Sequence, residues 1–102
     1  MRLLNNSSIE DLVIRLKSYV RNSLAAFVID YEGLIIYSTT PETENIELLA
    51  VFVRDVVGLI LSMVDLFGAS KINTVVIRID SYAFHIFPLE KIIGVIIAKR
   101  SS

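Results

Sequence analysis

The segment from Asn45 to Gly68 constrains the fold most, because it is predicted as a helix with more apolar surface than one sheet can cover. At about 100° per residue, its charged side chains fall within one arc of roughly 100°. These side chains are Glu47, Arg54, Asp55 and Asp65. An arc of roughly 220° is almost entirely apolar, although packing on one sheet needs a stripe of little more than about 100°. We therefore expect this helix to contact a second apolar partner besides its own sheet.

The composition favours an oligomer over a membrane protein as the reason for this apolar surplus. Hydrophobic residues make up 54% of the 102 residues, which is above the usual fraction for a soluble domain. Arg54, Asp55 and Asp65 interrupt the longest apolar segment, so no run reaches the roughly 20 residues that a membrane span needs. The first residues lack the apolar core of a signal peptide. We expect a single domain over residues 1–102, located in the cytoplasm and without membrane insertion.

The residue types that carry most catalytic and metal chemistry are scarce. The chain has no cysteine and one histidine, His85, in a predicted strand where a structural role is more common than catalysis. No glycine-rich phosphate-binding motif is present. A net charge of -1 with scattered lysines and arginines argues against nucleic acid as a partner. We therefore predict a non-enzymatic protein with no cofactor and no metal site.

The predicted elements follow the order helix, hairpin, long helix and three-stranded meander. Apolar residues at the i, i+3, i+4 spacing predict an amphipathic helix from Ser7 to Leu24. Two apolar runs then flank the turn Asp30-Tyr31-Glu32-Gly33, in which glycine can adopt a positive φ. Short turns make the last three runs antiparallel neighbours. These runs span residues 72–80, 82–88 and 92–99.

This order and two of its segments resemble the Roadblock/dynein light chain family. The segment AAFVIDYEGLIIYST has an apolar strand that ends in Asp30, a glycine turn at Gly33 and a second apolar strand. The segment VVIRIDSYAFHIFPLEKIIGVIIA has the pair Ile77-Arg78, a strand that ends in Pro88 and a final apolar strand. The resemblance implies an α/β (α+β, profilin-like) sandwich with a five-stranded antiparallel sheet of order 2-1-5-4-3. It places the long helix on one face and the first helix on the other.

The resemblance also implies a dimer, formed either with an identical chain or with a related Roadblock protein. Family members typically pack their long helices together and pair their third strands. The interface residues expected on this basis are Ile46, Ala50, Val53, Val57, Gly58, Leu61, Val75 and Ile77. The opposite flank of the helix is equally apolar, and the sequence does not choose between the two flanks. That flank contains Leu48, Phe52, Leu59, Met63 and Leu66.

The partner that the resemblance implies is a Ras-like small GTPase, held on a surface around the paired long helices. The candidate contact residues are the polar arc Glu47, Arg54, Asp55 and Asp65, unless these side chains only keep the helix soluble. One alternative is a light-chain-like adaptor that binds a peptide or helix of a larger complex. Another is a small enzyme or ligand sensor. The chain resembles the short family members without a C-terminal helix, which leaves part of one sheet face less covered.

Overall fold

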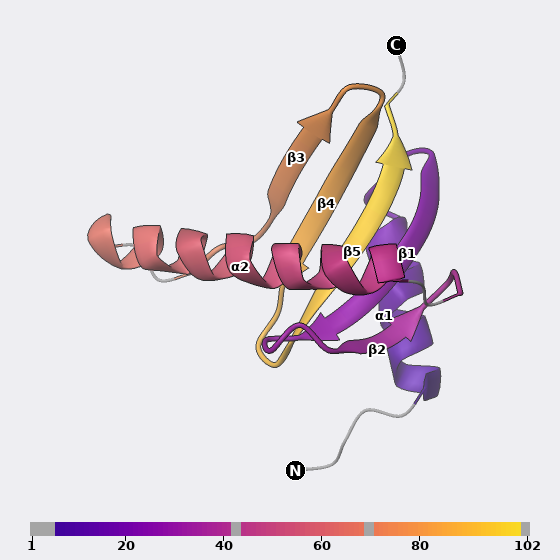
Figure 1. Cartoon of the computed structure of the whole chain (residues 1–102), viewed down its shortest axis with the longest axis horizontal. Coiled ribbons are helices and arrows are strands. Elements are labelled where there is room, and N and C mark those ends of the chain that lie inside the picture. The colour runs from indigo at the N-terminus through magenta and orange to yellow at the C-terminus, as the bar shows by residue number, and fades with distance from the viewer. Residues whose placement is uncertain (1–5, 42–43, 69–70, 101–102) are drawn as a thin grey trace.

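Two helices enclose a five-stranded antiparallel sheet in the computed structural model, which describes residues 6–41, 44–68 and 71–100. The elements are α1 (Asn6–Lys17), β1 (Ser23–Asp30), β2 (Ile35–Ser38), α2 (Glu44–Leu66), β3 (Val75–Ile79), β4 (Tyr82–Pro88) and β5 (Ile92–Lys99). The strand order is β2-β1-β5-β4-β3, with α2 on one face of the sheet and α1 on the other (Figure 1). The expected topology, strand order and placement of the helices are confirmed.

The centre of the sheet is buried on both faces because β1 and β5 carry apolar side chains on each side. The two strands pair antiparallel, with Val28 opposite Gly94. Phe27 and Ile29 pack with residues of α2, whereas Ala26 and Val28 pack with residues of α1. Each large side chain buried in this way contributes roughly 1.5–3 kcal/mol relative to exposure. The continuous apolar runs in the sequence therefore reflect a strand covered by a helix on each face.

The first helix is shorter than predicted, since α1 ends at Lys17 and not at Leu24. The Val20 N–H donates to the Lys17 carbonyl at 3.1 Å, which closes a tight turn. Asn22 then has φ 57°, a left-handed conformation that asparagine tolerates and that ends any helix. The helical spacing was misleading because Val20 is buried beneath the turn, while Leu24 already belongs to β1.

The long helix α2 packs on the sheet only through its first two-thirds. Ala50, Val53 and Val57 are at most 3% exposed and lie in one cluster with Ile86 and Ile93 of the sheet. No residue of α2 after Val57 is buried. Residues 58–66, about 13 Å of helix, project past β3 at the left of Figure 1, and we call them the overhang. Neither helix, over its described residues, combines the length and the hydropathy needed to cross a membrane.

Candidate functional site

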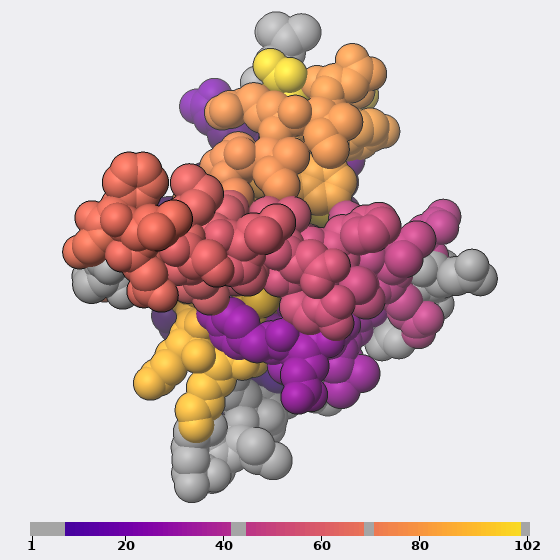
Figure 2. All heavy atoms as spheres, turned by 60° about the vertical axis from the view of Figure 1, so that its left-hand side comes forward, coloured from indigo at the N-terminus to yellow at the C-terminus, as the bar shows by residue number. Residues whose placement is uncertain are grey.

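The face of α2 that points away from the sheet is apolar, and we call it the outer stripe. Its members are Leu48, Phe52, Leu59, Met63 and Leu66, which are between 50% and 85% exposed. Their spacings of three, four and seven residues place them along one side of the helix. Figure 2 shows α2 crossing the front of the molecule, between the β1–β2 hairpin and the β3–β4 pair. A row of exposed apolar side chains along one side of a helix typically marks an interaction site.

The two apolar flanks of α2, which the sequence does not distinguish, differ in burial: one faces the sheet and the other is exposed. Ala50, Val53 and Val57 belong to the core, so a second copy cannot reach them while α2 stays on its own sheet. In the single chain, the sheet already covers these three residues of the expected interface. Their side chains are smaller than those of the outer stripe, which lets the helix lie close to the isoleucine-rich strands. Ile46 is half-buried near the start of the same face.

The sheet-facing side of α2 continues into the overhang, where the described part of the chain places no strand beneath it. Leu61 follows Val57 by four positions and Val64 follows it by seven, so both lie on the same face as Val57. Leu61 is 39% exposed and Val64 is half-buried, whereas Val57 is fully buried. Gly58 is exposed, and an added Cβ there would meet nothing within 4 Å. An apolar face built for a sheet thus extends beyond the sheet that it covers.

The edge strand β3 lies next to this overhang. It pairs with β4 on one side and, within the described residues, has no strand on the other. Val75 and Ile77 pack half-buried against the core on the α2 side, and Ile79 on the same face is 56% exposed. A free edge offers unpaired backbone N–H and C=O groups to another strand. The free edge of β3 and the exposed sheet-facing side of the overhang are therefore neighbouring surfaces.

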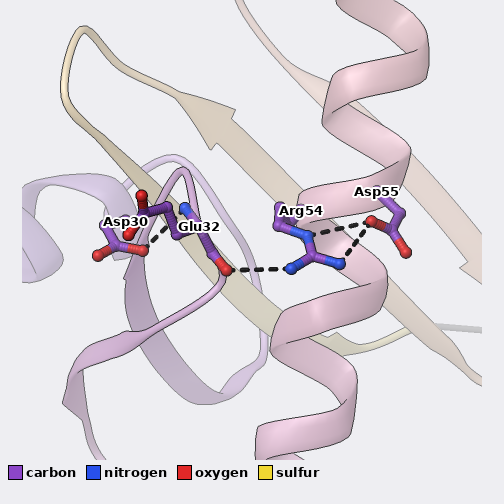
Figure 3. Close-up of polar contacts among 4 residues, drawn as sticks. All are labelled: Asp30, Glu32, Arg54 and Asp55. Carbon is purple, nitrogen blue, oxygen red and sulfur yellow. Dashed lines mark hydrogen bonds and ion pairs between the residues drawn. The ribbon is translucent and has the colours of Figure 1, made fainter.

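Within the polar arc, Arg54 joins α2 to the β1–β2 turn (Figure 3). Its Nε and Nη2 donate to Asp55 Oδ1 at 3.0 and 2.9 Å, and its Nη1 donates to the Glu32 carbonyl at 3.1 Å. In the turn itself, Asp30 Oδ1 accepts the backbone N–H of Glu32 at 2.9 Å. Arg54 and Asp55 therefore have a structural role beside any contact with a partner.

The glycine turn predicted between β1 and β2 is confirmed, and it is anchored from two sides. Gly33 has φ 90°, and an added Cβ would lie 3.4 Å from Arg54 Cδ. Tyr31, which no sequence pattern singles out, donates its hydroxyl to the carbonyl of Leu89 in the β4–β5 turn. Burial raises the pKa of the Tyr31 hydroxyl, so it remains a donor at neutral pH. The only signal for this contact was an aromatic residue in an otherwise polar turn.

Replacing Arg54 with alanine should loosen this turn without unfolding the protein. We expect the free energy of unfolding to fall by about 1 kcal/mol, because one hydrogen bond and one exposed ion pair are lost. The Asp55→Asn variant keeps the contact between Arg54 and Glu32, so its free energy of unfolding should fall by less. Urea denaturation measures both changes. Equal losses in the two variants would contradict a stabilising contact between Arg54 and the turn.

The other two members of the polar arc lie far from this contact. Glu47 and Asp65 are both exposed, and their separation of 18 positions corresponds to about 27 Å along the helix. Glu47 borders a hollow of about 200 Å³ that is also lined by Gly33 and the exposed Leu34 of the hairpin. The structure therefore brings Arg54 and Asp55 together but places Glu47 and Asp65 near opposite ends of α2.

His85 lies half-buried on β4, on the α1 side of the sheet. It lines the same hollow as Arg78 of the neighbouring strand. Burial, and secondarily the charge of Arg78, lowers the pKa of the His85 imidazole. The described residues contain no group of three or more His, Cys, Asp or Glu side chains that could hold a metal ion. At neutral pH the uncharged His85 can serve as a hydrogen-bonding wall of that hollow.

Acidification should destabilise the folded protein through His85. Because the folded state holds the pKa of His85 below its usual value of 6.5, the unfolded chain binds a proton first as the pH falls. The free energy of unfolding should therefore be insensitive to this group well above about pH 6.5 and decrease below it. Urea denaturation of His85→Gln should show a flatter dependence than the unmodified protein between about pH 7 and pH 5. Identical slopes would contradict this effect.

The chain matches one protein-family model and a group of solved structures. The model is the Roadblock/LC7 domain, matched over residues 4–98. The Roadblock/LC7 domain from Streptomyces avermitilis is similar with a TM-score of 0.75 at 18% identity, covering 89% of this chain and 78% of that chain. Gliding protein MglB from Thermus thermophilus has a TM-score of 0.72 at 17% identity, covering 95% and 77%. MglB with a tetrameric arrangement also has 0.72 at 17% identity, covering 95% and 76%. No curated sequence is similar enough to count as a match.

Proposed function

The chain belongs to the Roadblock/LC7 domain family, and from this premise we propose that it is a non-catalytic dimeric scaffold that binds and regulates a Ras-like small GTPase. The family resemblance implies the dimer and the class of partner. The observation that carries the proposal is that α2 has apolar side chains both on its overhang and along its outer stripe. The sheet-facing side of the overhang, with Leu61 and Val64, serves a second copy, and the outer stripe on the other side of the helix serves the GTPase.

In the proposed dimer, β3 of one copy pairs with β3 of the other. The overhang of each copy extends over the sheet of its partner. Leu61 and Val64 of each overhang are then buried against the apolar strands of the other copy and are no longer exposed to water. Two exposed Gly58 positions allow the paired helices to approach closely. Burial of roughly 25 cal/mol for each Å² of apolar surface offsets the cost of association. The tetrameric arrangement of one MglB structure is a precedent for self-association among similar proteins.

The GTPase contacts the outer stripe, which stays exposed on the far side of the helices after the dimer has formed. The stripe is apolar at its centre, and Glu47, Arg54, Asp55 and Asp65 form a charged border along one side of it. An apolar core with a polar rim is the usual anatomy of a protein interface. A scaffold of this kind shifts the GTPase between states only by binding one nucleotide state more tightly than the other. Regulation therefore requires a measurable difference between the GTP-bound and GDP-bound forms.

The test uses a Ras-like GTPase of the source organism, loaded with GTP or with GDP. The unmodified protein should bind one form more tightly and change the rate of GTP hydrolysis. Leu59→Glu places a charge at the middle of the outer stripe and should weaken this binding by at least roughly tenfold, while the protein remains dimeric. Absence of both binding and an altered hydrolysis rate at high protein concentration would contradict the proposed function. A dimer lost through Leu59→Glu would show that the outer stripe is the self-association surface.

An adaptor role is the second candidate, because the outer stripe also has the spacing of a surface that receives an amphipathic helix. A helix from a larger complex would lie along Leu48, Phe52 and Leu59 without any nucleotide dependence. Copurification with tagged protein separates the two roles. A long chain without a GTPase domain, lost in Leu59→Glu, would favour the adaptor.

A further inference from the structure

Over β3 and β4, the described residues leave the α1 side of the sheet uncovered by any helix. The helix α1 packs on β1 and β5, and Figure 1 shows it behind these two strands. On the open part, Arg78 pairs with Ala83 and Val76 pairs with His85 across the two strands. A hollow of about 300 Å³ lies here, between the end of α1, these strands and the end of β5. This surface lies on the opposite face of the sheet from the outer stripe.

The hollow is cationic although the whole chain carries a net charge of -1. Arg21, Arg78, Lys99 and Arg100 all line it, and no aspartate or glutamate does. Among the described residues, no carboxylate forms an ion pair with any of these four. Arg100 Nη1 donates to the carbonyl of Asp80 at 2.9 Å, which holds its guanidinium at the rim. Four like charges around one concavity attract an anion and lose mutual repulsion when it binds.

A second hollow, of about 360 Å³, continues the first and is less polar. The two share Tyr19 and His85, and the second is completed by Thr74 and Phe87. Tyr19 is 71% exposed, which leaves its ring free for an apolar contact. An inorganic anion would contact only the cationic hollow and would leave the less polar hollow empty. A flat membrane surface cannot enter either hollow. An acidic peptide that also carries an apolar side chain matches both ends.

We propose that this surface binds an acidic segment of a partner protein, with carboxylates at Arg21, Arg78 and Arg100 and an apolar side chain between Tyr19 and Phe87. This site is independent of the proposed GTPase surface. Binding here leaves the edge of β3 and the overhang accessible, so it is compatible with a dimer.

The test is fluorescence anisotropy with a fluorescein-labelled amphipathic peptide built from glutamate and leucine, and with its glutamine-for-glutamate analogue as a neutral probe. The acidic peptide should bind the full chain saturably and more weakly as salt rises. Arg78→Glu should weaken binding by roughly fivefold to tenfold, and Arg21→Glu should act in the same direction if Arg78→Glu folds poorly. Arg15→Glu makes the same charge change on the exposed surface of α1 outside this hollow and should have a much smaller effect.

We also expect Tyr19→Ala to lower the affinity for the acidic peptide and to leave the affinity for inorganic phosphate unchanged. Equal binding of the acidic and neutral peptides would overturn the proposal, as would equal effects of Arg78→Glu and Arg15→Glu. Binding of phosphatidylserine vesicles without binding of the peptide would assign the cationic surface to a membrane and would also overturn it. Light scattering should show that the bound protein keeps the mass of the free protein plus the peptide.

Discussion

A glutamate in place of Leu61 should convert the proposed dimer into a folded monomer. Leu61 lies on the sheet-facing side of the overhang, where the proposed second copy supplies strands that the described residues of one chain do not. A carboxylate buried there without a cation loses its hydration and gains no partner, which costs several kcal/mol. The dissociation constant should therefore rise at least about hundredfold. Sedimentation equilibrium over a range of concentrations measures this change.

The matched control is Ile14→Glu, which makes the same kind of replacement on the opposite side of the sheet. Ile14 is 67% exposed on α1 and takes no part in the proposed interface. Its variant should associate as tightly as the unmodified protein, and circular dichroism should show both variants folded. A Leu61→Glu protein that stays as tightly dimeric as Ile14→Glu would exclude the overhang as the interface.

An aspartate in place of Val57 should unfold the chain itself, whereas the Leu61 variant should only dissociate the dimer. Val57 is fully buried between α2 and the sheet, in a cluster with Ile86 and Val95. A charge at this position has no described cation within the core, so we expect a loss of at least about 4 kcal/mol. Small domains have only about 5–15 kcal/mol of stability in total. Thermal melting followed by circular dichroism should show a loss of the cooperative transition or a large decrease in its midpoint.

Val57→Ala provides the milder comparison, since it removes two methyl groups and adds no charge. Its expected loss is about 2 kcal/mol from transfer and cavity contributions, which leaves a folded protein. A Val57→Asp protein that melts like the unmodified chain but has lost its partner would place Val57 at the interface and not in the core.

Much of the fold could be predicted because its strands carry strong apolar patterns and short turns. The continuous runs of β1 and β5 indicate strands covered on both faces, and the turn at Gly33 needs the positive φ that glycine adopts there. The end of α1 could not be predicted from spacing. Val20 continues the apolar stripe from outside the helix, and the left-handed Asn22 that separates it from β1 has no periodic signal.

The candidate site was only partly predictable, because both sides of α2 are apolar. Periodicity places Leu61 in line with Val57 but does not show where the sheet ends beneath the helix. That boundary depends on the width of the sheet and on the angle at which α2 crosses it (Figure 1). Because the sheet ends between the two positions, Val57 is buried and Leu61 is half-exposed.

The cationic hollow is a second feature that the linear sequence conceals. Arg21 follows α1, Arg78 lies in β3, Lys99 ends β5 and Arg100 comes directly after it. In the sequence these residues are scattered, and only Lys99-Arg100 is an adjacent basic pair. The strand order brings them together because β3, β4 and β5 are consecutive in the sheet.

We propose that a second copy of this chain covers the overhang and the edge of β3. Size-exclusion chromatography with light scattering tests it most directly, on the unmodified protein over a wide concentration range. The chain mass is 11.4 kDa. We expect a mass of twice this value, or a multiple of it, that persists on dilution to micromolar protein. A mass of one chain at every concentration would contradict the proposal.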